Sequence, residues 1–98
     1  MIEIIGYLHA AVVVSNLDRA IEFYTNILGL ERIDRQLKYP GAWYQIGDFQ
    51  LHLIENTNER YSDNINLNIS TRNPHIALAV RDLDAAKQQL LAANCIVK

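Results

Sequence analysis

The chain repeats a strand-and-helix segment of itself after 66 residues. Between His9 and Leu30, six of 22 positions carry the same residue 66 positions later, without a gap: His9, Ala11, Val14, Leu17, Asp18 and Ala20. Average composition would give roughly one or two such matches. We interpret the segment as an internal duplication, which favours a fold built from two similar units. Independent strand and helix patterning would explain the apolar matches, but not the paired histidines His9 and His75.

Local patterns predict the elements of the first copy. A valine-rich strand at 7–14 is followed by a helix over 17–28, which starts at Ser15 or Asn16 and ends at Gly29. Two apolar runs then flank Gly47-Asp48, a pair typical of a two-residue β-hairpin turn. The first unit should therefore contain a strand, a helix and a hairpin.

The second copy predicts a strand at 75–80 and a helix at 82–93, which begins at Asp82 and stops at Asn94. Residues 56–74 contain six asparagines and a proline, a composition that indicates a linker. The counterpart of the hairpin would lie beyond Lys98. We therefore expect the second unit to be incomplete, because the chain is a fragment or because it borrows strands from a partner.

All three histidines of the chain fall in predicted strands. Side chains alternate between the two faces of a strand, so His9 and His75 each share a face with small residues, while the bulkier face can pack under the helix. The third, His52, shares its face with Gln50, and the Gly47-Asp48 turn would place Trp43 opposite it. We expect this face to line a cavity, although a strand tryptophan more often fills a core.

Three histidines in such positions favour a metal site over purely structural roles. Neutral imidazole is the commonest metal ligand near neutral pH, and imidazoles with a carboxylate suit Zn, Fe, Ni or Mn. Single histidines at strand ends are usually hydrogen-bonded structural groups, which remains the alternative.

The residues resemble a known family. The stretches "LHAAVVVSNLDRAIEFYTNILGLE", "QLHLIE" and "HIALAVRDLDAAKQQLLAAN" are together similar to the vicinal oxygen chelate superfamily, which includes glyoxalase I, extradiol dioxygenases, fosfomycin-resistance proteins and bleomycin-resistance proteins. The resemblance implies an α+β fold of tandem βαβββ modules that form a curved mixed sheet around a metal. It divides the chain into a first module at 1–55, a linker at 56–74 and an incomplete second module at 75–98, truncated after its helix.

The resemblance also implies roles for single residues. His9, His52 and His75 match three of the four ligand positions of the superfamily, while the fourth, usually Glu, has no match in this chain. Trp43 and Gln50, on the same face as His52, are the candidate substrate contacts. Glu55 has the opposite alternation to His52, so we do not expect it to be a ligand.

Two functions follow from the resemblance. The first is a metal-dependent enzyme, an isomerase, lyase or dioxygenase, that coordinates neighbouring oxygens of a small-molecule substrate on divalent Fe, Ni, Zn, Mn or Co. The alternative is a metal-free protein of the same fold that binds a small molecule or antibiotic, as bleomycin-resistance proteins do. A generic domain with structural histidines is a third reading.

Composition limits the partners and the setting. The net charge is −2 with acids and bases interspersed, which argues against a nucleic acid or membrane partner. The single cysteine cannot form an internal disulfide, so we expect a cytoplasmic protein. The small size of the core and the resemblance together lead us to expect a homodimer.

Overall fold

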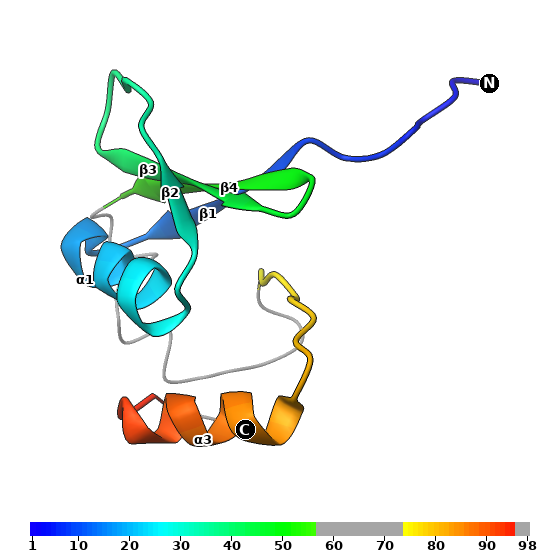
Figure 1. Ribbon diagram of the computed structural model, residues 1–98. Helices are drawn as coiled ribbons and strands as arrows, with labels where there is room; N and C mark the ends of the chain where they lie inside the picture. Colours follow the sequence, from blue (N-terminus) through cyan, green and yellow to red (C-terminus); the bar gives the residue numbers. More distant parts are fainter. Residues whose placement is uncertain (57–73, 96–98) are drawn as a thin grey trace.

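The computed structural model describes residues 1–56 and 74–95, which form a four-stranded mixed sheet and a helical layer (Figure 1). The strands are β1 (His9–Val14), β2 (Glu31–Ile33), β3 (Gly41–Ile46) and β4 (Phe49–Glu55), arranged in the order β1-β4-β3-β2. β1 pairs with β4 in parallel, and the other two pairings are antiparallel. The first copy of the repeat thus builds one complete βαβββ unit.

The helix between β1 and β2 begins where the sequence predicts. Asn16 is its cap, because the Asn16 side chain accepts a hydrogen bond of 3.1 Å from the backbone N–H of Arg19. α1 (Leu17–Ile21) continues directly into the π-helical segment η1 (Glu22–Ile27). Gly29 follows in the left-handed conformation with φ of 70°, which favours glycine, and ends the helix.

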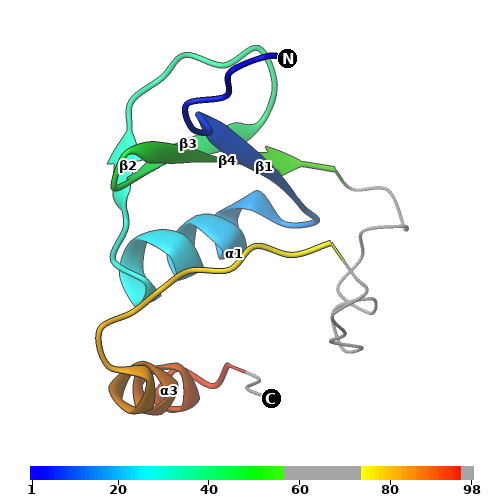
Figure 2. The same ribbon diagram turned by 90° about the vertical axis from the view of Figure 1, so that its right-hand side faces the viewer.

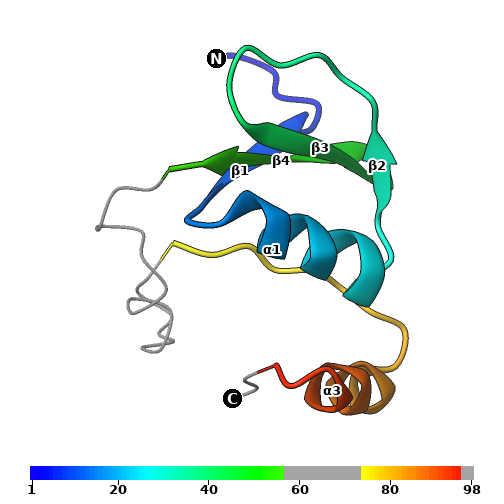
Figure 3. The same ribbon diagram turned by 90° about the vertical axis from the view of Figure 1, so that its left-hand side faces the viewer.

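This helical layer covers one face of the sheet (Figures 2 and 3). Ala42, Tyr44, Leu51 and Leu53 form the buried core between the sheet and the helix. Val12 and Val14 of β1 pack against that core, whereas His9, Ala11 and Val13 lie on the exposed side of the strand. The predicted division of β1 into a bulky helix-facing side and a histidine-bearing side is therefore confirmed.

The hairpin formed by β3 and β4 has the predicted register. Ile46 pairs with Phe49 across the Gly47-Asp48 turn, and Trp43 pairs with His52. Because paired residues of neighbouring strands point to the same side of a sheet, this register places Trp43 and His52 side by side.

The second copy forms its helix but not its strand. α3 (Leu83–Ala92) is capped by Asp82, whose carboxylate accepts from the backbone N–H of Ala85 at 2.9 Å, and Asn94 follows with φ of 62°. The strand predicted at 75–80 is wrong, since these residues have no ladder partner. In the first copy β1 is held by β4, and among residues 1–56 and 74–95 no strand takes the role of β4 for the second copy.

The segment 74–82 lies on the helix side of the sheet, where Ile76 packs against the core (Figures 2 and 3). The predicted linker 56–74 falls almost entirely outside the described residues, as does most of the strand start expected at 95–98. No helix in the described part of the chain is long and apolar enough to cross a membrane.

Candidate ligand site on the histidine face

The sheet face opposite the helices carries two of the three histidines, and we call it the histidine face. The parallel ladder pairs His9 with Gln50 and Ala11 with His52, and the antiparallel ladder adds Trp43 beside His52. Four of the predicted site residues, His9, Trp43, Gln50 and His52, are thus gathered by three adjacent strands.

Trp43 is the centre of this group. Its indole stacks on the His52 imidazole, with ring centroids 4.0 Å apart and an interplanar angle of 11°. The ring of His9 meets it edge-on at 5.1 Å. Only 8% of Trp43 is exposed, and its Nε1 is buried without a hydrogen-bond partner. Such an orphaned donor costs about 1–3 kcal/mol relative to a satisfied one, which makes it a candidate ligand contact.

The β2–β3 connection at 34–40 folds over the same face. Arg35 places its guanidinium carbon 4.2 Å from the centroid of the Trp43 ring, a cation–π contact, and donates a long hydrogen bond of 3.4 Å to Oε1 of Gln50. The hydroxyl of Tyr39 lies 3.5 Å from Nε2 of His52. Sequence reasoning missed both residues, because they lie in a stretch without strand or helix periodicity. The available signal for these two site residues was that Arg35 and Tyr39 shortly precede Trp43 in the sequence.

The electrostatics of the face are those of a cationic site. Burial lowers the pKa of His52 below its ordinary value of 6.5, and the neighbouring His9 and Arg35 lower it further. An imidazole whose pKa is lowered in this way stays neutral at physiological pH. Its nitrogens can therefore accept a hydrogen bond or coordinate a metal.

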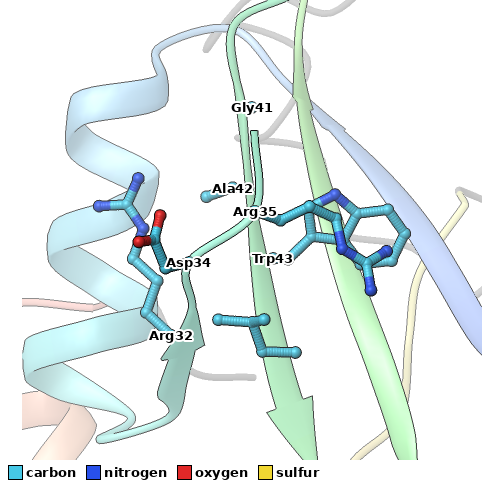
Figure 4. Close-up of a pocket in the computed structure, with 7 residues that line it drawn as sticks. Arg32, Asp34, Arg35, Gly41, Ala42 and Trp43 are labelled. Carbon is cyan, nitrogen blue, oxygen red and sulfur yellow. The ribbon is translucent and has the colours of Figure 1, made fainter. Parts of the chain in front are cut away.

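A cavity of about 390 Å³ adjoins Trp43 where β2 leaves the sheet. Its lining consists of Arg32, Ile33, Asp34, Arg35, Gly41, Ala42 and Trp43. In Figure 4 Arg35 extends over the Trp43 ring, whereas Arg32 and Asp34 point to the other side, toward the helix. The backbone of Leu53 leaves no space for a side chain at Gly41, since a Cβ at this position would lie 2.5 Å from the carbonyl oxygen of Leu53.

The sequence profile of the glyoxalase/bleomycin resistance protein/dioxygenase superfamily matches residues 6–98. The chain belongs to this superfamily. The family predicted from the sequence is thereby confirmed, together with the α+β fold class.

Several solved structures share the fold of this chain. A protein from Bacillus anthracis described as a glyoxalase family member is 23% identical, with 96% of this chain and 74% of that chain covered and a TM-score of 0.72. The fosfomycin resistance protein of Listeria monocytogenes is 18% identical over 94% of this chain and 67% of its own, with a TM-score of 0.70. Lactoylglutathione lyase of Agrobacterium tumefaciens is 19% identical over 93% of this chain and 71% of its own, with a TM-score of 0.61. These likenesses show the fold alone. No curated protein matches the chain.

Two of the three predicted metal ligands share one face of the sheet. His9 and His52 share the histidine face, whereas His75 belongs to the segment 74–82 on the helix side of the sheet. Within residues 1–56 and 74–95, no group of three histidine, cysteine or carboxylate side chains could hold a metal. Glu55 is used elsewhere, as its Oε2 accepts a hydrogen bond of 2.8 Å from the backbone N–H of Leu17. The three-histidine ligand set stays a prediction.

Proposed function

We propose that the chain is a small-molecule-binding member of the superfamily and that the ligand binds at the histidine face, beside Trp43. The observation that carries this proposal is the buried indole N–H of Trp43, which has no acceptor. The adjoining cavity of about 390 Å³ lies within the range of about 300–1,000 Å³ typical of small-molecule sites. An acceptor oxygen on the ligand would satisfy the N–H, and the aromatic rings would supply apolar contact area.

Trp43 is the only tryptophan, so its indole gives one signal in a ¹H–¹⁵N spectrum and accounts for the tryptophan fluorescence. We expect catechol, a neutral ring with two neighbouring oxygens, to shift this signal saturably and to quench the fluorescence. Trp43→Phe keeps an aromatic ring but removes the N–H, and it should weaken the affinity about tenfold. Because this variant has no indole signal, its binding is measured from the shifts of backbone amide signals. Equal binding by this variant, or shifts confined to the helix side of the sheet, would contradict the proposal.

A second candidate function, that of a metal-dependent enzyme, is supported by the proximity of His9 and His52. Both imidazoles contact the Trp43 ring, with centroids 5.1 Å and 4.0 Å from it, and they share one face of the sheet, as two ligands of one divalent ion would. Such an ion, when bound, supplies Lewis-acid polarisation of substrate oxygens. A metal enzyme usually provides three protein ligands, and the described residues offer two at this face. They do not complete a centre, so we derive no catalytic step through a metal.

Elemental analysis separates the two candidates. If the predicted ligand set is right, protein dialysed against Zn²⁺ should retain about one ion per chain, and His9→Ala, His52→Ala and His75→Ala should each remove most of it. Retention by His75→Ala alone would leave His9 and His52 as ligands and exclude His75. Absence of bound metal from the unsubstituted chain would leave the metal-free binding function.

A further inference from the structure

We propose that the ligand carries an anionic group, a carboxylate or a phosphate-type oxyanion, and that this group binds between the guanidinium of Arg35 and the indole N–H of Trp43. This inference rests on the proposed small-molecule binding at the histidine face and specifies the chemistry of its ligand. It is independent of whether a metal binds.

The first support is the unused charge of Arg35. Its contacts are with neutral groups, the amide oxygen of Gln50 at 3.4 Å and the ring of Trp43 at 4.2 Å. Within the described residues no carboxylate pairs with it. A guanidinium presents five N–H donors in a planar fork suited to an oxyanion, and a single long bond to an amide leaves most of them available.

The second support is the placement of an orphaned donor beside that charge. The Trp43 indole lies under the Arg35 guanidinium, and its buried Nε1 lacks an acceptor. An indole nitrogen can only donate, so its partner must be an acceptor. A ligand oxyanion with several lone pairs could accept from both residues at once, and bonds of this charge-assisted kind are among the strongest in proteins.

The third support is the balance of charge around the cavity. Arg32 and Arg35 contribute two positive charges to its lining, and Asp34 is the single acidic lining residue. Figure 4 shows Asp34 on the side of the cavity that faces the helix, away from Arg35. Arg32 lies on the same side as Asp34, so Arg35 is the charged lining residue on the side of Trp43, and the apolar wall formed by Ile33 strengthens its attraction for an anion.

Matched probes test the charge directly on chelator-treated full-length protein. Benzoate and benzamide have the same ring and similar size but differ in charge, and methylphosphonate and inorganic phosphate supply tetrahedral oxyanions. We expect benzoate or the tetrahedral anions to move the Trp43 indole N–H signal saturably and at least tenfold more tightly than benzamide. The tighter of the two anion types identifies the ligand as a planar carboxylate or a tetrahedral oxyanion.

Arg35→Gln should weaken anion binding about tenfold, while Arg35→Lys should retain part of the affinity. Lys38→Gln is the matched control, because it removes the same charge from the same connection outside the cavity lining, and it should change the affinity less than twofold. Equal losses for Arg35→Gln and Lys38→Gln would reduce the effect to general attraction and overturn the inference. Equal binding of benzoate and benzamide would overturn the inference alone, whereas no shift with any probe, catechol included, would overturn the proposed function as well.

Discussion

His52 is the residue whose environment most clearly departs from that of a surface group. It is 4% exposed, stacked on Trp43, and its pKa is lowered by burial, by His9 and by Arg35. The unfolded chain therefore takes up a proton at His52 at a higher pH than the folded chain does. This contribution to stability is complete above pH 6.5, the ordinary pKa, and is lost progressively as the pH falls below it.

Two measurements check this prediction. The His52 ring signals in NMR should titrate below pH 6.5 in the folded protein. His52→Gln, which cannot titrate, should flatten the decline of unfolding free energy on the acid side, and His75→Gln on the exposed segment serves as its control. A His52 pKa at or above the ordinary value would contradict the burial argument.

The residues of the site differ in how far sequence could predict them. Trp43 and His52 were predictable as neighbours, because a two-residue turn fixes hairpin register and alternation then fixes the face. Arg35 and Tyr39 were not, because a connection without periodicity gives no rule for where its side chains fold. The sequence therefore predicted the site residues on the strands and missed those in the connection at 34–40 that folds over them.

At the scale of elements, Glu55 ties the last strand to the first helix. Its carboxylate at the end of β4 accepts from the backbone N–H of Leu17, one of the first amides of α1, which have no partner within the helix. We expect Glu55→Ala to lower the unfolding free energy by about 1–3 kcal/mol, because it removes a charge-assisted bond from a half-buried amide. Urea denaturation measures this loss.

Glu55→Gln should recover part of that stability, since the amide oxygen can still accept. Glu31→Ala removes the same charge from an exposed position on β2 and should change stability by less than about 0.5 kcal/mol. If Glu55→Ala and Glu31→Ala had equal effects, the hydrogen bond to α1 would carry no stability.

The repeat shows where element prediction succeeds and where it fails. Helix limits follow from local chemistry, and the expected caps at Asn16 and Asp82 both form. A strand depends on a partner elsewhere in the chain. The same strand pattern that yields β1 beside β4 therefore leaves 75–80 without a ladder.

At the scale of the whole molecule, burial is concentrated in the first unit. Tyr44, Leu51 and Leu53 are fully buried between the sheet and α1, whereas α3 has no buried residue and Leu83 is 75% exposed. Regions with little buried apolar surface open locally at lower free energy than the core. We therefore expect amides of α3 to exchange hydrogen well before those of β3 and β4, as measured by mass spectrometry of peptides.

The same exchange measurement bears on the expected homodimer. If a second copy covers the exposed apolar side chains of α3, exchange within Leu83–Ala92 should slow as the protein concentration rises, while exchange in Phe49–Glu55 should stay constant. Leu83→Ser lowers the apolar area at the most exposed large side chain of α3 and should abolish that dependence. Slow exchange of α3 at every concentration would contradict the burial argument, because the helix would then be held within its own chain.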